Sequence, residues 1–367
     1  MTGGIVRKLS RLVPGGIALA LVAAACAPNA SQDSLKPAGL YAEKIDNLFR
    51  PIFWIATAIF LIVEGVLIYL VIRYRHRDGR QSIPPQVHGN KRLEIAWTIL
   101  PALILVGVAV PTVSTIYDLA AKPTGRVLNV SVIGHQWWWE FDYPDLNVNT
   151  ANELHIPVGQ PVYLSLCAAG AGYEKQPAPN DCQDVSEIIG DSVIHSFWVP
   201  QLGGKQDVVP GRTNNLLIQA DRPGVYTGQC AELCGLSHAY MRFTVVAQPR
   251  DEFNAWVRGQ QADAARPAEG SLAATGFDVF MDANTCIRCH AIQGTEAASI
   301  GGPNLTHFAS RDCFAGCIFE MTRANLTRWL DNPSAVKGGV PGGTWMPDYN
   351  LTDDQIKALV AYLMTLT

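Results

Sequence analysis

The chain has 367 residues, of which 28 are Lys or Arg and 32 are Asp or Glu, so its formal net charge is only -4. It contains no block of basic residues and no stretch in which basic and aromatic residues alternate. Composition therefore gives no support to a nucleic-acid-binding protein, and we expect no nucleic acid partner.

The first 26 residues have the pattern of an export signal. A basic start with Arg7, Lys8 and Arg11 is followed by a short apolar run and by Cys26 after three alanines. This order is typical of a signal peptide over residues 1–26. Two cleavage modes fit: a lipoprotein-type cleavage that leaves Cys26 as a lipid-bearing N-terminus, or cleavage after an A-x-A motif. Both predict export.

Two longer apolar segments follow, IFWIATAIFLIVEGVLIYLVI at 52–72 and AWTILPALILVGVAVPTVSTI at 96–116. Each has the length that the hydrocarbon core of a bilayer requires, so residues 40–120 are predicted to form a transmembrane helical hairpin. Buried core helices are the alternative. The loop between the segments carries RYRHRDGR and KR, which places it in the cytoplasm and everything after residue 117 outside. Glu64 lies within the first segment, where a charge usually faces protein.

The rest of the chain is long enough for two domains. Between residues 126 and 248, short runs rich in Val, Ile, Leu and Thr are separated by Gly, Pro and Asn, which predicts an all-β sandwich or barrel. Residues 249–271 contain a helical pattern, RDEFNAWVRGQQ, and a linker-like stretch, ADAARPAEGS. Residues 272–367 form a third section with helical patterns and their own cysteines.

A group of soft metal ligands lies on one loop, CAELCGLSHAYM, between two predicted strands. It contains Cys230, Cys234, His238 and Met241, and His195 in VIHSFWVP is the best candidate for a further ligand. Cysteines of an exported protein pair into disulfides by default, so a Cys230–Cys234 disulfide is the alternative. Thiolates, a thioether and imidazole together suit copper, whereas a zinc site would not need Met241.

At these residues the sequence resembles a known family. HSFWVP, CAELCGLSHAYM, GHQWWWEFDYP at 134–144 and LEIAWTILP at 93–101 are similar to subunit 2 of the haem-copper cytochrome c oxidases, over roughly residues 40–256. The resemblance implies two membrane helices followed by a Greek-key cupredoxin domain at 126–248. It also implies a binuclear copper centre, CuA, bridged by Cys230 and Cys234, whose terminal ligands are His195, His238, Met241 and the backbone carbonyl of Glu232.

The resemblance assigns three further roles. The side chain of Glu232 would also reach a magnesium ion at the boundary with the catalytic subunit. Trp137 matches a surface aromatic residue through which electrons arrive from cytochrome c, while for Trp138 and Trp139 we favour simple packing. Glu94 matches an acid at the mouth of a proton-uptake path, although an interfacial glutamate is often only solvated.

The third section contains Cys286-Ile287-Arg288-Cys289-His290, the C-x-x-C-H motif. Two thioethers at Cys286 and Cys289 would attach a c-type haem, and His290 would bind its iron. A chance motif or a zinc or redox pair is the alternative. The helical context and GGPNL at 301–305 resemble cytochromes c, which implies an all-α class I cytochrome c domain at 272–367.

Met346, in TWMPDY after a glycine-rich run, is the predicted sixth iron ligand. A His/Met pair raises the reduction potential, as suits a donor to an oxidase. Met321 and Met364 are the competing candidates, but Met364 lies in a helical segment that begins with a Thr352/Gln355 capping box, where packing is the simpler role.

Four cysteines have no role in these sites. Cys167 and Cys182 bracket a Gly- and Pro-rich insertion and are the better candidates for a disulfide in an oxidising compartment. Cys313 and Cys317 could pair or stay reduced near the haem, and on a regular helix this spacing would be awkward to bridge.

The combined pattern predicts an electron-transfer subunit of a respiratory terminal oxidase in a bacterial plasma membrane, with its copper and haem domains outside. Electrons would enter at the haem on Cys286 and Cys289, pass to CuA by way of Trp137, and leave for a separate catalytic subunit that reduces oxygen to water. Expected cofactors are CuA, one covalent haem c and a magnesium ion shared with catalytic subunit 1. Other oxidase subunits and an upstream donor, cytochrome c or a quinol-cytochrome c reductase, are the expected partners.

Three other functions fit the sequence less well. A nitrous oxide reductase would need a further catalytic copper domain, for which the chain has neither the length nor the histidines. A quinol oxidase subunit resembles a version without the copper ligands, and a copper-delivery protein would have no reason for a haem domain.

Overall fold

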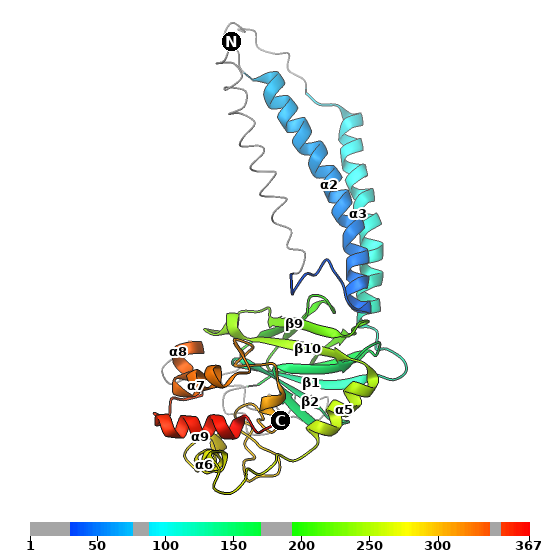
Figure 1. The fold of residues 1–367 in the computed structure, drawn as a ribbon. Coiled ribbons are helices and arrows are strands. Elements are labelled where there is room, and N and C mark those ends of the chain that lie inside the picture. Colours follow the sequence, from blue (N-terminus) through cyan, green and yellow to red (C-terminus); the bar gives the residue numbers. More distant parts are fainter. Residues whose placement is uncertain (1–29, 76–87, 170–192, 338–345) are drawn as a thin grey trace, which may run out of the picture.

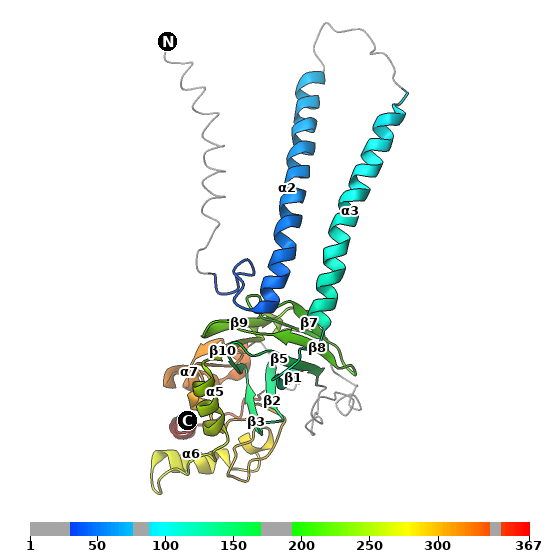
Figure 2. The same ribbon diagram turned by 90° about the vertical axis from the view of Figure 1, so that its right-hand side faces the viewer.

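The computed structural model describes residues 30–75, 88–169, 193–337 and 346–367, which form a helical hairpin, a β-sandwich and a C-terminal domain (Figure 1). The predicted signal peptide, with Cys26, lies outside the described residues. Helices α2 (Leu40–Tyr74) and α3 (Lys91–Ala120) rise together from one side of the sandwich, and the C-terminal domain lies on the other side (Figure 2).

Both long helices expose their apolar side chains along the stretches that the sequence predicts to span the membrane. Each helix is longer than its predicted segment, since both ends of the helix continue into residues outside the apolar stretch. The first turns of α2 pack on the sandwich, where Tyr41, Ala42 and Asp46 are buried. Helix α3 begins at Asn90, whose side chain accepts hydrogen bonds from the backbone of Arg92 and Leu93 and so caps the helix. The predicted hairpin is therefore confirmed.

The β-sandwich consists of two five-stranded sheets in the orders β3-β2-β1-β5-β8 and β4-β10-β9-β6-β7. Most neighbours are antiparallel, but β1 pairs with β5 and β10 with β4 in parallel, because the chain crosses between the sheets. The strands are β1 (Leu128–His135), β2 (Trp138–Tyr143), β3 (Val148–Ala151), β4 (Glu153–Pro157), β5 (Val162–Ala168), β6 (His195–Trp198), β7 (Lys205–Val208), β8 (Asn214–Ile218), β9 (Gly224–Cys230) and β10 (Arg242–Gln248).

Aromatic rings fill the space between the sheets next to the copper loop. The rings of Phe197 and Phe243 stack at 4.5 Å between centroids, and Trp139 meets both edge-on at 5.4 and 5.6 Å. All three side chains are fully buried, so the packing prediction for Trp139 is confirmed. A Cβ atom on Gly228 of β9 would lie 2.2 Å from the Phe243 ring. Only glycine at this position lets β9 lie so close to the aromatic cluster.

Helix α5 (Arg250–Gln260) leaves the sandwich, and the exposed stretch after it leads to the C-terminal domain. This domain contains α6 (Leu272–Phe280), α7 (Arg323–Asp331), α8 (Pro333–Lys337) and α9 (Asp353–Leu363). Helices α6 and α9 cross closely, since a Cβ atom on Gly276 would lie 2.0 Å from the carbonyl oxygen of Ala358. The predicted capping box of Thr352 and Gln355 is present at the start of α9.

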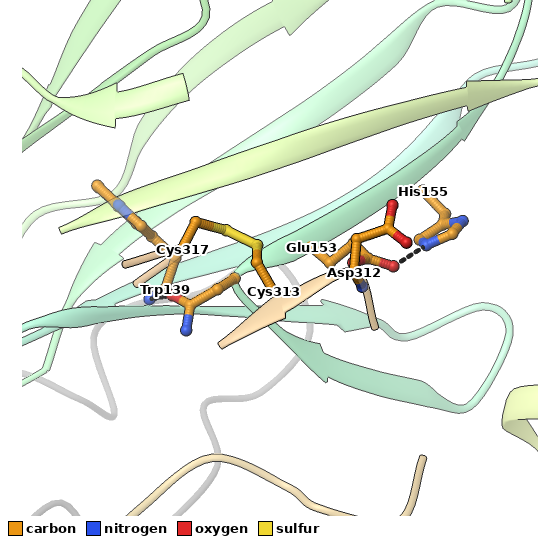
Figure 3. The surroundings of a disulfide bond; sticks show 7 residues. Trp139, Glu153, His155, Asp312, Cys313 and Cys317 are labelled. Carbon is orange, nitrogen blue, oxygen red and sulfur yellow. Dashed lines mark hydrogen bonds and ion pairs between the residues drawn. A yellow bond between two sulfur atoms is a disulfide. The ribbon is translucent and has the colours of Figure 1, made fainter. Parts of the chain in front are cut away.

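One short hairpin interrupts this otherwise helical domain. Strands β11 (Cys313–Phe314) and β12 (Phe319–Glu320) are joined by a turn, and Cys313 and Cys317 form a disulfide across it (Figure 3). The two cysteines lie on a β-hairpin and not on a regular helix, where the pair would be awkward to bridge. Ala315 and Cys317 have φ angles of 56° and 54°, so the backbone reverses direction and brings the two Cα atoms within 4.8 Å. Cys167 is also disulfide-bonded, but Cys182 lies outside the described residues.

Candidate metal and haem centres

The predicted copper ligands are brought together by strand pairing. The loop that carries Cys230, Cys234, His238 and Met241 connects β9 to β10, whose strands pair antiparallel. His195 is the first residue of β6, and β6 pairs with the end of β9 so that Phe197 lies opposite Cys230. Residues 35 positions apart thus become neighbours, and the nearest ligand atoms of His195, Cys230 and Cys234 all lie within 4.8 Å of one another.

The remaining donors surround the two sulfur atoms. The sulfurs of Cys230 and Cys234 lie 3.7 Å apart. His195 Nδ1 lies 3.9 Å from the first, and His238 Nδ1 lies 3.7 Å from the second. Met241 Sδ lies 3.8 Å from Cys234 Sγ, and the carbonyl oxygen of Glu232 lies 3.2 Å from Cys230 Sγ. Two sulfurs in the centre and four donors around them match the predicted ligand set.

The two thiols behave as a pair that shares one proton. A hydrogen bond from Cys234 lowers the pKa of Cys230, and the same interaction, together with burial, raises the pKa of Cys234. One thiolate is therefore available at neutral pH, and bound metal would displace the second proton. Buried soft donors whose atoms face one another fit copper, and these residues would hold it.

Glycine at position 235 shapes the copper loop. Its φ angle is +116°, a conformation that side chains rarely adopt, and a Cβ atom there would lie 2.7 Å from Cζ2 of Trp137. The loop can therefore lie directly on the Trp137 ring. The Trp137 indole N–H in turn donates to the carbonyl oxygen of Cys234 at 2.8 Å, and the Gln136 side chain donates to the same oxygen.

Trp137 does not lie at an open surface of this chain, since only 4% of it is exposed. The copper loop lies on its ring, and the residue also lines a cavity shared with the C-terminal domain. Its role as the entry point for electrons stays a prediction. Trp138 also faces the C-terminal domain, and its ring stacks on His135 at 4.0 Å between centroids. Trp139 thus packs inside the sandwich, whereas Trp137 and Trp138 border a cavity between the domains.

This cavity contains the C-x-x-C-H motif. Cys286, Cys289 and His290 line one side of it, and Trp137 and Trp138 line the other, so both domains contribute to its wall. Apolar side chains from the C-terminal domain complete the lining: Leu305, Phe308, Phe314 and Trp329. Both motif cysteines are free thiols. An apolar cavity with two free thiols and a histidine at its edge fits a covalently bound haem.

His290 is held in a fixed orientation within this cavity. Its Nδ1 bonds with the carbonyl oxygen of Pro303, 2.8 Å away, which leaves Nε2 free for iron. Burial lowers the pKa of His290, so the imidazole is neutral, as ligation requires. A Cβ atom on Gly302 would lie 2.9 Å from the ring, so the glycine allows the loop to pass this close. The loop GGPNL at 301–305, which resembles cytochromes c, therefore supports His290.

Met346 lies in the same cavity, as the sequence predicts for the sixth ligand. The indole N–H of Trp329 points to its sulfur at 3.2 Å. Met321, Met346 and Met364 all pack against the hydrophobic core of the C-terminal domain, but among these three only Met346 is one of the described residues that line the cavity. Trp329 carried no signal in the sequence, because nothing links it to Met346 until α7 is packed against the cavity.

The predicted acidic residues lie apart from these two centres. The side chain of Glu232 is exposed on the copper loop, so it is free to meet a metal or a second subunit. Glu94 lies in the first turn of α3, and Glu64 lies within α2; both side chains are exposed. The structure does not bring Glu94 or Glu64 near the copper ligands.

Comparison with known proteins places each part of the chain. The families described as "Cytochrome C oxidase subunit II, transmembrane domain", "Cytochrome C oxidase subunit II, periplasmic domain" and "Cytochrome c" match residues 30–115, 128–248 and 273–367. The chain is 38% identical over 367 residues, 98% of each chain, to "Cytochrome c oxidase subunit 2" of Alkalihalophilus pseudofirmus.

Two other relatives cover less of the chain. The protein of the same name from Bacillus sp. (strain PS3) is 37% identical over 311 residues, which are 80% of each chain. "Quinol oxidase subunit 2" of Bacillus cereus is 30% identical over 267 residues, 71% of this chain and 83% of its own. The match to the first relative extends across all three parts.

Proposed function

This chain belongs to the cytochrome c oxidase subunit 2 family, and from that premise we propose that it delivers electrons from its own cytochrome c domain through its cupredoxin domain to the oxygen-reducing subunit. Haem c and CuA supply one-electron redox chemistry when they are bound. The residues of this chain hold the two groups, keep water away from them and fix their separation.

One observation carries the proposal: the haem cavity and the copper loop share a wall. Trp137 lines the cavity that contains Cys286, Cys289 and His290, and its indole N–H bonds with the carbonyl oxygen of Cys234 at 2.8 Å. A single buried side chain therefore contacts both candidate centres. Trp137 would therefore form a direct contact between the cytochrome c domain, which donates electrons, and the cupredoxin domain, which accepts them.

Several finer assignments belong to the same proposal. The two helices would cross a bacterial plasma membrane with both soluble domains on its outer side, next to catalytic subunit 1. The exposed carboxylate of Glu232 would bind magnesium at that boundary. Glu94, at the start of α3, would accept protons on the cytoplasmic side. An upstream cytochrome c or quinol-cytochrome c reductase would reduce the C-terminal domain.

The test is purification of the oxidase from membranes with its partner subunits, followed by optical and electron paramagnetic resonance spectra. We expect a c-type haem band, two copper ions per chain with a mixed-valence signal, and oxygen uptake with reduced cytochrome c. A preparation that lacks either the haem band or the binuclear copper signal would contradict the proposed function.

A further inference from the structure

Lys337 is a residue of the C-terminal domain whose polar groups both bind the cupredoxin domain. It ends α8, and only 8% of it is exposed. Its Nζ donates to the carbonyl oxygen of Trp137 at 2.5 Å, and its own carbonyl oxygen accepts from the hydroxyl of Ser237. Within the part of the chain that the structure describes, no carboxylate lies within ion-pair distance of Nζ.

A lysine buried without a carboxylate is costly and needs an explanation. Burial lowers the pKa of Lys337 to about 7, although Cys234 opposes this effect. The bond to Trp137 does not depend on the charge, because a neutral amine still carries N–H donors. The Lys337 side chain therefore acts as a hydrogen-bond donor to the Trp137 carbonyl oxygen and not as a partner in an ion pair.

Both partners of Lys337 adjoin the copper ligands. Trp137 donates its indole N–H to the carbonyl oxygen of Cys234, and Ser237 lies on the copper loop between Cys234 and His238. Lys337 itself lines the haem cavity. Lys337 thus connects the haem cavity to Ser237 on the copper loop and to Trp137, which bonds to the carbonyl oxygen of Cys234.

The disulfide hairpin touches the same loop beside Lys337. A Cβ atom on Gly316 would lie 2.1 Å from the carbonyl oxygen of Tyr240 and 3.2 Å from Lys337 Nζ, so only glycine permits this contact. Just before the hairpin, the backbone N–H of Asp312 donates to Glu153 of the cupredoxin domain at 3.3 Å (Figure 3). The cytochrome domain is therefore seated on the copper loop at several points, and Lys337 supplies two of its hydrogen bonds.

We propose that Lys337 is a positioning residue for electron transfer between the two domains: its hydrogen bonds to Trp137 and Ser237 fix the haem cavity against the copper loop. This inference rests on the proposed function. Electron tunnelling slows exponentially with separation, so a docked geometry that is held firmly gives a faster rate than one that fluctuates. Lys337 would thus set the rate without binding either redox group.

The experiment replaces Lys337 by methionine, K337M, in the full chain within the purified oxidase complex. Methionine has a similar length and no N–H donor. The loss of a buried hydrogen bond predicts a roughly tenfold smaller equilibrium constant for docking, and therefore a larger share of loosely docked molecules and a slower haem-to-copper transfer after flash reduction. Pulsed electron paramagnetic resonance is expected to give a broader haem-to-copper distance distribution, and hydrogen exchange to be faster at residues 230–241 and 313–320.

Two variants serve as controls. K337R keeps N–H donors on a long side chain and should restore most of the distance distribution and the rate. K357M removes an exposed lysine of α9 whose ion-pair partner among the described residues is the exposed Asp354, and it should behave as the unsubstituted protein. A residue that only stabilised the fold would lower the haem and copper content in K337M without altering the distance distribution of the loaded molecules.

Failure of this inference and failure of the proposed function have different signatures. If K337M keeps the distance distribution and the rate of the unsubstituted protein, Lys337 does not position the domains. If the unsubstituted protein lacks haem c or CuA, the proposed function itself is wrong. Should K337M lose haem or copper, K337Q replaces it: its amide is too short to reach the Trp137 carbonyl, and an unchanged distance distribution there would overturn the inference.

Discussion

Met346 is the residue on which the predicted haem ligation depends most. Its sulfur lies in the cavity with His290 and receives the Trp329 indole N–H at 3.2 Å. We expect M346L to abolish the low-spin His/Met haem signal and to lower the midpoint potential of the haem, because leucine offers no ligand atom. Optical spectra and redox titration of the purified protein measure both effects, while the copper signal should stay unchanged.

The matched control is M364L. Met364 follows α9 and packs against the core of the C-terminal domain, so its loss should leave the haem spectrum intact. A normal His/Met signal in M346L would remove Met346 from the ligand set and return Met321 and Met364 to consideration.

Asp142, on β2, is expected to make stability depend on pH. Burial and the nearby Glu140 raise its pKa from the model-compound range to about 6. The folded state then holds this proton more tightly than the unfolded state, so the contribution of Asp142 to stability is present below about pH 4 and is lost as pH rises through 6. D142N should therefore stabilise the full chain by about 2 kcal/mol at pH 7 to 8 and by little near pH 4.

Chemical denaturation of the full chain in detergent, repeated across this pH range, measures the difference. D145N is the control, since Asp145 is exposed and an asparagine can still accept the hydrogen bond from Asn129. An equal effect of D142N at pH 4 and pH 8 would contradict the assignment of the buried carboxyl as the cause.

The copper loop is the element in which local conformation and ligation depend most directly on each other. Gly235 has a φ angle of +116° and lies where a Cβ atom would meet the Trp137 ring at 2.7 Å. G235A should strain the backbone by about 1 to 3 kcal/mol and displace the ring, so we expect copper affinity to fall by roughly tenfold or more. Copper content after dialysis against a chelator and the binuclear copper signal measure this loss.

Gly259 provides the control for the same substitution. It lies in α5, and no atom would come within 4 Å of an added Cβ. G259A should leave copper binding unchanged and stabilise the helix by about 0.5 to 1 kcal/mol. Equal copper affinity in G235A and G259A would contradict the prediction that a side chain at position 235 disturbs the copper loop.

Some elements could be predicted from their own sequence, and others could not. Apolar length and a basic loop were sufficient for α2 and α3, and the C-x-x-C-H motif was sufficient for the haem cysteines, because these signals are local. The β11–β12 hairpin was missed, since its strands have two residues each and its cysteine spacing also occurs on helices. Its turn depends on positive φ angles at Ala315 and Cys317, residue types that carry no such signal.

At the scale of the whole molecule, the sequence predicted the domains but not the residues of their contact. Spacing brings Cys230, Cys234, His238 and Met241 together within one loop, and His195 was a candidate because it lies at the end of a β-like run that a sandwich could bring beside this loop. The predicted path from the haem to the copper ligands by way of Trp137 implied that the domains meet near this residue, but it did not name the residues that make the contact. The burial of Trp137, and the part played by Lys337 from 200 residues away, arise only when the two domains pack against each other.

The fused cytochrome domain leads to a last prediction, on how the whole molecule responds to salt. A linker of this length gives an effective concentration on the order of millimolar, so encounter between the domains does not limit the rate. The described contacts at Lys337 involve a backbone carbonyl and a hydroxyl, and the Glu153 and Arg311 side chains nearby are largely buried. Salt screens buried groups only weakly. We therefore expect the haem-to-copper rate to be unchanged between low and high ionic strength and independent of protein concentration.

Flash reduction of the C-terminal haem at several salt concentrations measures this rate, with reduction of the copper centre as the signal. The control protein carries a protease site within residues 261–270, where most side chains are exposed, and is cut before the measurement. After cleavage the two domains are separate molecules, so weakly docked pairs can dissociate and the rate should come to depend on dilution. A salt-sensitive rate in the uncut chain would mean that the domains separate and meet again at each turnover, and that the packed arrangement around Trp137 is not the one through which electrons pass.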